Sequence, residues 1–197
     1  AVQSRKPRDS EIDVWGLTHP GLVRKSNEDH FLLASLHKHL EIKATSLPGD
    51  VWPTDDRLAF LAMVADGVGG RAAGEEASRL ALAEVTQYVT QSTNCYYQAD
   101  ARGDEFIDIL QEAATRSHER VRERGLADRE LQGMATTLTL WIGVWPWAYL
   151  LQVGDSRYYL YRHGTLTQVT RDQTMAQELV DQGVMTRSAA FGSRWAN

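Results

Sequence analysis

The chain of 197 residues carries 26 Asp and Glu against 21 Lys and Arg, which gives a formal net charge of −5. This length predicts one domain, and 43% hydrophobic with 24% charged residues is typical of a folded chain rather than a disordered one. The acidic balance argues against nucleic acid as the main partner, because nucleic-acid-binding domains usually carry a basic excess. We predict a flexible N-terminal segment over residues 1–11 and one domain over residues 12–197.

The cysteine content and the hydropathy pattern indicate the cellular compartment in which we expect the protein. Cys95 is the only cysteine, so no disulfide can form within the chain, and no charged segment followed by an apolar one opens the sequence. We therefore expect a cytoplasmic protein without a signal peptide. Residues 131–154 carry no charge, but their apolar residues alternate with period two on both sides of Pro146. This alternation predicts two buried strands joined by a turn, and no membrane span.

Secondary structure is predicted in the order strands, two helices, strands and a short helix. Strands are expected over residues 12–18, 30–36, 58–65, 134–144, 148–154, 156–162 and 165–169. Helices are expected over residues 74–90, 104–124 and 173–182, with Glu75 and Glu76 starting the first and Gly125 stopping the second. The strand over residues 58–65 is continuously apolar, so we expect it to be buried on both faces. The grouping indicates an α+β fold with helices packed on antiparallel sheet.

A run of glycines follows the predicted central strand. Residues 66–70 are Asp-Gly-Val-Gly-Gly, so a carboxylate stands at the end of a buried strand with the Gly67 carbonyl beside it. Glycine allows positive φ and close approach of the backbone, and oxygen ligands of this kind suit Mg²⁺ and Mn²⁺. The alternative is that Asp66 only caps a Gly-rich turn. The residues of this run alone leave both interpretations open.

The same glycines also match a dinucleotide-binding fingerprint, with Gly67, Gly69 and Ala72 at the required spacing. Glu75 and Glu76 disfavour this interpretation, because a pyrophosphate needs backbone amides and positive potential at the start of the following helix. That helix is also predicted to lead into a second helix and not into a parallel strand. We therefore reject a dinucleotide site.

Two further segments carry carboxylates. Glu28 and Asp29 lie in the turn before the second predicted strand, and Arg24 precedes Glu28 by four residues. A guanidinium can bind phosphate oxygens bidentately, although a solvated turn with one incidental ion pair would explain the same residues. Asp155 lies at a tight link between two predicted strands, where an ordinary hairpin turn is the simpler interpretation.

Together these segments resemble the protein phosphatase 2C family of metal-dependent Ser/Thr phosphatases, and most of all its bacterial branch. Four motifs occur in the family's order: R-x-x-x-E-D at residues 24–29, D-G-x-G-G at 66–70, G-x-A-T-T at 133–137 and V-G-D-S-R at 153–157. Residues 166–173 also resemble the bacterial branch, and residues 178–180 and 183–186, which follow, resemble its flap-like segment. The resemblance covers nearly the whole chain from about residue 12.

The resemblance implies a binuclear metal centre. Asp66 would bridge two Mn²⁺ or Mg²⁺ ions, the Gly67 carbonyl would bind one of them, and Asp155 would help to hold a third, weaker ion. Glu28 and Asp29 would support the metal-bound waters. Two ions at about 3.5–4 Å can activate a bridging water and hold an in-line displacement at phosphorus, so no protein nucleophile is needed.

The resemblance also implies a substrate and an architecture. Arg24 would bind the substrate phosphate and, with Asp66, would be a catalytic residue. The substrates would be proteins phosphorylated on serine or threonine, and a Ser/Thr kinase could be a partner in signalling. The implied architecture is an α-β-β-α sandwich, in which two packed antiparallel β-sheets are flanked by helices.

The chain departs from the family pattern in two places. Val68 stands where eukaryotic members often have a histidine, a candidate general acid. Two metal-binding aspartates that the family places beyond the flap have no counterpart before Asn197, so we expect the C-terminal part of the domain to be missing. The alternative function is therefore a non-catalytic or truncated phosphatase-like domain that acts as a binding or regulatory module.

Overall fold

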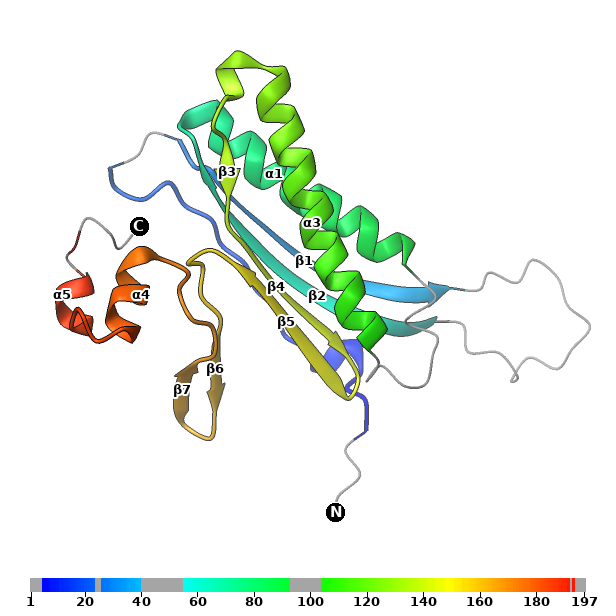
Figure 1. Ribbon diagram of the computed structural model, residues 1–197. Coiled ribbons are helices and arrows are strands. Elements are labelled where there is room, and N and C mark those ends of the chain that lie inside the picture. Colours follow the sequence, from blue (N-terminus) through cyan, green and yellow to red (C-terminus); the bar gives the residue numbers. More distant parts are fainter. Residues whose placement is uncertain (1–4, 24–25, 40–54, 93–103, 192, 194–197) are drawn as a thin grey trace, which may run out of the picture.

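The structure is a computed structural model and describes residues 5–23, 26–39, 55–92, 104–191 and 193 (Figure 1). Its strands are β1 (Asp29–His39), β2 (Asp55–Val68), β3 (Ala135–Thr136), β4 (Leu138–Val144), β5 (Trp147–Val153), β6 (Tyr159–Arg162) and β7 (Thr165–Gln168). Its α-helices are α1 (Arg71–Gln91), α3 (Asp104–Ala127), α4 (Met175–Asp181) and α5 (Arg187–Phe191). Two short 3₁₀ helices are η1 (Asp9–Glu11) and η2 (Arg129–Leu131).

The strands form a larger and a smaller antiparallel sheet. The larger sheet has the order β1-β2-β4-β5, with β3 paired to the end of β2, and the smaller sheet consists of β6 and β7. Helices α1 and α3 pack against each other over one face of the larger sheet (Figure 1). Val144 pairs with Trp147 across the link between β4 and β5, which confirms the turn predicted at Pro146. The predicted α+β class with antiparallel sheets is confirmed.

The main core lies between the larger sheet and the two long helices. Side chains alternate along β2, so that Leu61 and Met63 are 2% and 1% exposed whereas Val64, on the opposite face, is 42% exposed. The buried cluster on the helix side includes Leu61, Met63, Val85, Val89, Phe106, Leu110, Leu140 and Ile142. In the described part of the chain, helices cover one face of this sheet and Val64 on the other face is exposed, so the prediction that residues 58–65 would be buried on both faces is wrong.

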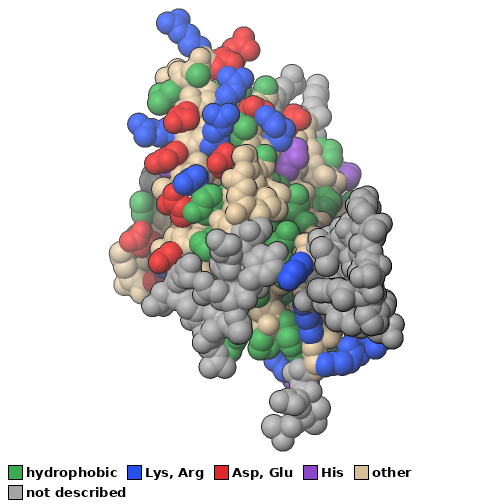
Figure 2. All heavy atoms as spheres, turned by 90° about the vertical axis from the view of Figure 1, so that its right-hand side faces the viewer, with side chains coloured by type: hydrophobic (Ala, Val, Ile, Leu, Met, Phe, Trp, Pro, Cys, Tyr) green, Lys and Arg blue, Asp and Glu red, His purple; other side chains and the backbone are tan. Residues whose placement is uncertain are grey.

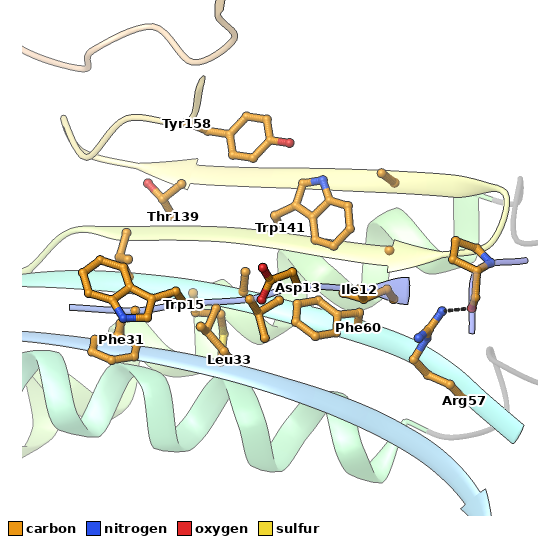
Figure 3. A pocket seen from close by; sticks show the side chains of 18 of the residues that line it. Ile12, Asp13, Trp15, Phe31, Leu33, Arg57, Phe60, Thr139, Trp141 and Tyr158 are labelled. Carbon is orange, nitrogen blue, oxygen red and sulfur yellow. Dashed lines mark hydrogen bonds between the residues drawn. The ribbon is translucent and has the colours of Figure 1, made fainter. Parts of the chain in front are cut away.

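The face of the larger sheet that lies away from the helices carries an apolar groove of about 1050 Å³. Phe31, Phe60 and Trp141 line it from three neighbouring strands, and Trp15 lies beside Phe31 (Figure 3). Residues 12–18, which were predicted to be a strand, pass along this groove without forming one. Ile12 is partly buried, whereas Val14, Trp15 and Leu17 are 47%, 79% and 68% exposed, so the apolar residues of this segment make only partial contact with the groove.

Two helix boundaries differ from the prediction for reasons that concern glycine. Helix α1 starts at Arg71, after Gly70 at φ +78°, so Glu75 and Glu76 lie beyond its first turn. Helix α3 continues past Gly125 to Ala127. A Cβ on Gly125 would lie 3.2 Å from the carbonyl oxygen of Leu131, so this glycine allows close packing on the next segment and does not stop the helix.

The exposed sides of the long helices are polar. Lys and Arg side chains alternate with Asp and Glu side chains over the upper part of the molecule (Figure 2). Ion pairs join Arg79 to Glu76 on α1 and Arg116 to Glu112 on α3, both at 2.8 Å. Within the described residues, no helix combines the length and the apolar character needed to cross a membrane.

An exposed ion pair near the N-terminus gives a pH-dependent prediction. The carboxylate of Glu11 accepts hydrogen bonds from the Arg5 side chain and from the Arg8 backbone N–H, and these lower the pKa of Glu11 from 4.5 to about 2. Because the pKa is lower in the folded state, the stabilisation by this contact is present above pH 4.5 and is lost as the pH falls toward 2.

We expect Arg5→Gln to raise the pKa of Glu11 toward 4.5, since the Arg5 side chain is the largest cause of the shift. The measurement is an NMR titration of the Glu11 carboxyl carbon. Arg116→Gln, on the distant helix α3, serves as the matched control and should leave that pKa unchanged. An unaltered pKa of Glu11 in Arg5→Gln would contradict the assignment.

Candidate active site

Two of the predicted carboxylates meet across neighbouring strands. Asp29 is the first residue of β1 and Asp66 lies near the end of β2, and the antiparallel register places their Cα atoms opposite each other. A cavity of about 240 Å³ opens at this end of the sheet, and both aspartates and Ser156 line it. Three of the four sequence motifs therefore contribute a residue to one cavity. His19, from the N-terminal segment, lines it as well.

The backbone of Asp66 is held by two threonines of the third motif. The Asp66 carbonyl accepts hydrogen bonds from the Thr137 N–H at 2.9 Å and from the Thr136 hydroxyl at 3.0 Å. The Asp66 N–H donates to Thr137 Oγ1 at 3.0 Å. Thr137 lies between β3 and β4 and bonds to both the N–H and the carbonyl of Asp66. Asp66 is thus fixed at the end of the central strand.

Glycines allow the start of α1 to approach Glu28 and the end of β2. A Cβ on Gly67 would lie 2.0 Å from the Gly74 carbonyl oxygen, and a Cβ on Gly74 would lie 2.1 Å from Glu28 Oε2. The Gly67 N–H donates to the Glu28 carbonyl at 3.2 Å, and the Ser78 hydroxyl donates to the same carbonyl at 2.6 Å. Glu28 is 9% exposed. The position of Glu28 therefore depends on the absence of side chains at two glycines.

Asp155 lies on the turn that follows β5. Gly154 has φ +100°, and a Cβ there would be 2.7 Å from Thr137 Cγ2, so this turn requires glycine both for its conformation and for its packing. Gly154 also exchanges two hydrogen bonds with Gln173, from its N–H to Gln173 Oε1 at 2.9 Å and from the Gln173 N–H to its carbonyl at 3.0 Å. The turn with Asp155 is thereby tied to the segment that leads into α4.

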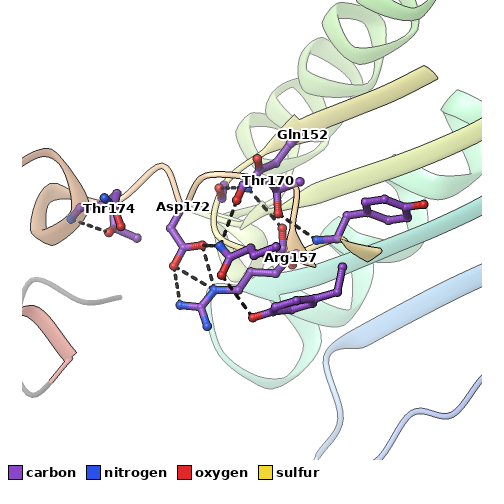
Figure 4. A network of polar contacts seen from close by, with 11 residues as sticks. Gln152, Arg157, Thr170, Asp172 and Thr174 are labelled. Carbon is purple, nitrogen blue, oxygen red and sulfur yellow. Dashed lines mark hydrogen bonds and ion pairs between the residues drawn. The ribbon is translucent and has the colours of Figure 1, made fainter. Parts of the chain in front are cut away.

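A polar network continues from this turn toward α4 (Figure 4). The Arg157 guanidinium binds the Asp172 carboxylate through two nitrogens, Nε to Oδ1 at 2.9 Å and Nη2 to Oδ2 at 2.5 Å. These hydrogen bonds raise the pKa of Arg157 above its ordinary value. Thr170 accepts a hydrogen bond from the Tyr158 N–H at 2.9 Å. Arg157 is therefore engaged by Asp172, and this contact links the residues after the turn to the segment before α4.

The structure brings some of the predicted site residues together, and one of them lies outside the described residues. The structure brings Asp29 and Asp66 together, with Gly67 next in the chain, and it places Glu28 against the start of α1. Ser156, the neighbour of Asp155, joins the same cavity. Arg24 lies outside the described residues.

The donors at this cavity are hard oxygen ligands, which fit Mg²⁺ or Mn²⁺ in kind. The two aspartates line it from neighbouring strands, and the Gly67 carbonyl follows Asp66 directly. Among the residues that the structure describes, no three His, Cys, Asp or Glu side chains are grouped closely enough to hold a metal ion. The described donors therefore have the right chemistry for these ions, but they are fewer than the ligands of a metal ion that is coordinated by protein side chains alone.

Sequence reasoning did not assign roles to Thr136, Thr137 and Ser156. All three occur within the motifs, and their hydroxyls bond to or lie beside the carboxylate segments. One signal was present in the sequence, because residues 136, 137 and 139 are threonines in an otherwise apolar run. Polar groups in a buried strand are expected to have hydrogen-bond partners, and here those partners are Asp66 and Ser156.

Comparison with known proteins decides the family. A family model described as Protein phosphatase 2C matches residues 49–196. The chain belongs to the protein phosphatase 2C family. The resemblance inferred from the four motifs is thereby confirmed.

Several bacterial members of the protein phosphatase 2C family are similar to this chain. The serine/threonine protein phosphatase PstP of Mycobacterium tuberculosis is 36% identical over 132 residues, which cover 67% of this chain and 24% of PstP. The serine/threonine phosphatase stp of Listeria welshimeri is 29% identical over 174 residues, which cover 88% of this chain and 60% of that protein. The chain thus spans less than two thirds of the length of either relative.

Solved structures of this family have the same fold. A PstP catalytic domain in complex with two manganese ions has a TM-score of 0.63 at 30% identity, covering 88% of this chain and 61% of that one. The serine/threonine phosphatase of S. agalactiae has a TM-score of 0.68 at 25% identity, covering 92% of this chain and 64% of that one. The chain therefore matches well over half of each solved structure.

Proposed function

We propose that this domain hydrolyses phosphoserine and phosphothreonine in proteins, with water activated by a binuclear Mn²⁺ or Mg²⁺ centre. The observation that carries this proposal is the pairing of Asp29 with Asp66 at a cavity that Ser156 also lines. Three motifs that are far apart in the sequence supply these residues. Membership of the protein phosphatase 2C family and the manganese complex of a PstP catalytic domain support the same assignment.

The carboxylates would share the work of holding cations. Asp66 would contact both ions and the Gly67 carbonyl one of them, while Glu28 and Asp29 would orient bound waters by hydrogen bonds. Asp155 would contribute to a third, weaker position. When bound, Mn²⁺ or Mg²⁺ would lower the pKa of a water molecule and neutralise charge that builds up on the phosphoryl group.

Arg24 would bind the substrate. Its guanidinium matches the geometry of two phosphate oxygens, and this contact would orient the phosphoryl group for attack from the opposite side. Phosphorylated proteins are the proposed substrates, which makes a Ser/Thr kinase the proposed source of the phosphate groups. We expect Arg24→Ala to raise KM for a phosphopeptide more than it alters metal affinity.

A second candidate function is a binding module without turnover. The observation that favours it is that the described residues include no group of three metal-ligating side chains. Such a domain would bind phosphoproteins through Arg24 and a single weakly held cation. The two functions differ in turnover and not in recognition, so one assay distinguishes them.

The test is Mn²⁺-dependent hydrolysis of p-nitrophenyl phosphate and of a phosphothreonine peptide. We expect Asp66→Asn to lower kcat/KM by at least about 100-fold, because removal of a charge that stabilises the transition state has an effect of this order. Asp108→Asn is the matched control, since Asp108 is exposed on α3 and distant in sequence from every motif. Binding of the same peptide is measured by fluorescence anisotropy.

Each outcome selects one interpretation. Turnover that does not depend on the metal, or that survives Asp66→Asn, would overturn the proposed centre. Peptide binding without turnover would favour the binding module. Activity only in a longer form of the chain would favour truncation.

A further inference from the structure

A single hydroxyl oxygen touches both of the segments that carry the proposed metal ligands. Thr137 Oγ1 accepts the hydrogen bond from the Asp66 N–H at 3.0 Å and lies 2.7 Å from Ser156 Oγ. Ser156 follows Asp155 directly, and it lines the cavity with Asp66. Thr137 is 9% exposed, so its contacts are largely shielded from water. The strand end at Asp66 and the turn at Asp155 are therefore joined through one side chain.

The hydrogen-bonding capacity of the two hydroxyls is consistent with this link. A hydroxyl donates one hydrogen bond and accepts up to two. Because Thr137 Oγ1 accepts from Asp66, it can either donate its own proton to Ser156 or accept a second bond from it. In both cases the 2.7 Å contact is a hydrogen bond of ordinary length between two hydroxyls. Loss of either hydroxyl would leave its partner without this bond.

The backbone of Ser156 is held by side chains of β4 and β5. Its carbonyl accepts hydrogen bonds from the Thr139 hydroxyl at 2.9 Å and from the Gln152 side-chain amide at 3.3 Å. Thr139 lies two residues after Thr137 and is 5% exposed. Asp155, in contrast, makes no hydrogen bond or ion pair with any other described residue. Its placement therefore depends on how firmly its two neighbours are held, Gly154 by Gln173 and Ser156 by Thr137, Thr139 and Gln152.

The methyl group of Thr137 has a separate role that can be tested separately. Thr137 Cγ2 lies where a Cβ on Gly154 would approach it to 2.7 Å, so the methyl packs against the turn while the hydroxyl bonds to Asp66 and Ser156. Valine at position 137 keeps the shape and removes the hydroxyl. Serine keeps the hydroxyl and removes the methyl. The two variants thus distinguish hydrogen bonding from packing.

We propose that Thr137 and Ser156 are positioning residues that hold the Asp155 turn in register with Asp66, and thereby set the cation affinity of the weaker position. The inference rests on the proposed function, because it concerns cations held by these two aspartates. Residues that orient metal ligands through hydrogen bonds typically change metal affinity by 10–100-fold when they are removed. Neither residue needs to touch the cation or the substrate.

The test is a Mg²⁺ titration of the ¹⁵N-labelled 197-residue chain, read from the backbone amide signals of Gly67 and Asp155. We expect Ser156→Ala to raise the apparent Kd at Asp155 by roughly ten-fold and to leave that at Gly67 within about two-fold. Thr137→Val should raise both values by roughly ten-fold, because it also releases the Asp66 N–H. Thr137→Ser should restore both, since the hydroxyl is present again.

The outcomes separate this inference from the proposed function. If Mg²⁺ moves neither amide signal in the unsubstituted chain, the proposed metal centre is wrong and the inference is overturned with it. If Mg²⁺ moves both signals but Ser156→Ala leaves the affinity at Asp155 unchanged, only the inference is overturned. Ser156 is only partly buried, so its alanine variant remains informative even if Thr137→Val does not fold.

Discussion

Substitution of Gly67 by alanine is expected to lower the free energy of unfolding by about 4 kcal/mol or more, a loss reached only when a buried contact cannot relax. The added Cβ would lie 2.0 Å from the Gly74 carbonyl oxygen and 2.8 Å from the Glu28 carbonyl oxygen. Both are backbone atoms. Gly74 belongs to the first turn of α1, and the Glu28 carbonyl already accepts the Gly67 N–H, so neither can withdraw without loss of other contacts.

Urea denaturation followed by circular dichroism measures this loss. Gly133→Ala is the matched control, because Gly133 has φ +82° and no atom within 4 Å of the added Cβ. It should therefore show only the backbone strain of about 1–2 kcal/mol that a left-handed conformation imposes on alanine. If Gly67→Ala destabilises the protein no more than Gly133→Ala does, the close approach of α1 to β2 is wrong.

Gly74→Ala, in contrast, is expected to leave the protein folded and to weaken its binding of Mn²⁺ by about 10–100-fold. The added Cβ would lie 2.1 Å from Glu28 Oε2 and 2.9 Å from Glu28 Cδ, which form the far end of a flexible side chain. That carboxylate can turn away at small cost, and alanine is favoured over glycine inside a helix by about 1 kcal/mol. The Cβ would also lie 3.0 Å from the Gly67 carbonyl carbon, a backbone atom that must shift slightly, so we expect a smaller loss of stability than in Gly67→Ala together with displacement of the Glu28 carboxylate.

Isothermal titration with Mn²⁺ and urea denaturation of the same samples test both halves of this prediction. Glu28→Ala should weaken Mn²⁺ binding to a similar extent, and the double variant should be no weaker than either single one, because all three act through one carboxylate. Additive losses in the double variant, or full Mn²⁺ affinity in Gly74→Ala, would show that Glu28 does not mediate the effect.

Much of the fold could be predicted because it follows from local patterns. The period-two alternation on both sides of Pro146 correctly indicated the hairpin of β4 and β5, and the helical periodicity indicated α1 and α3. The strand expected over residues 12–18 was wrong, because within the described residues no strand pairs with this segment. Trp15 and Leu17 are 79% and 68% exposed, so apolar side chains in this segment did not indicate burial in a sheet.

The candidate site was predictable as a set of carboxylates but not as an arrangement. The Asp-Gly run and the Glu28-Asp29 pair could be found in the sequence, whereas the alignment of Asp29 with Asp66 depends on the register between β1 and β2. The link from Thr137 to Ser156 depends on a side-chain contact between two turns, which leaves no periodic signal. The role of Gly74 could not be predicted either, because it comes from close contact with Glu28, which is distant in the sequence.

The position of β2 within the sheet has a consequence for how long each carboxylate keeps its place. β2 is paired on one side with β1 and on the other with β3 and β4, and its inward side chains form the centre of the core. Segments of this kind open only when the whole domain unfolds, whereas turns at a sheet edge can open locally. We therefore expect Asp66 to stay in position for as long as the domain is folded. Asp155, beside the edge strand β5, can leave its position and return without global unfolding.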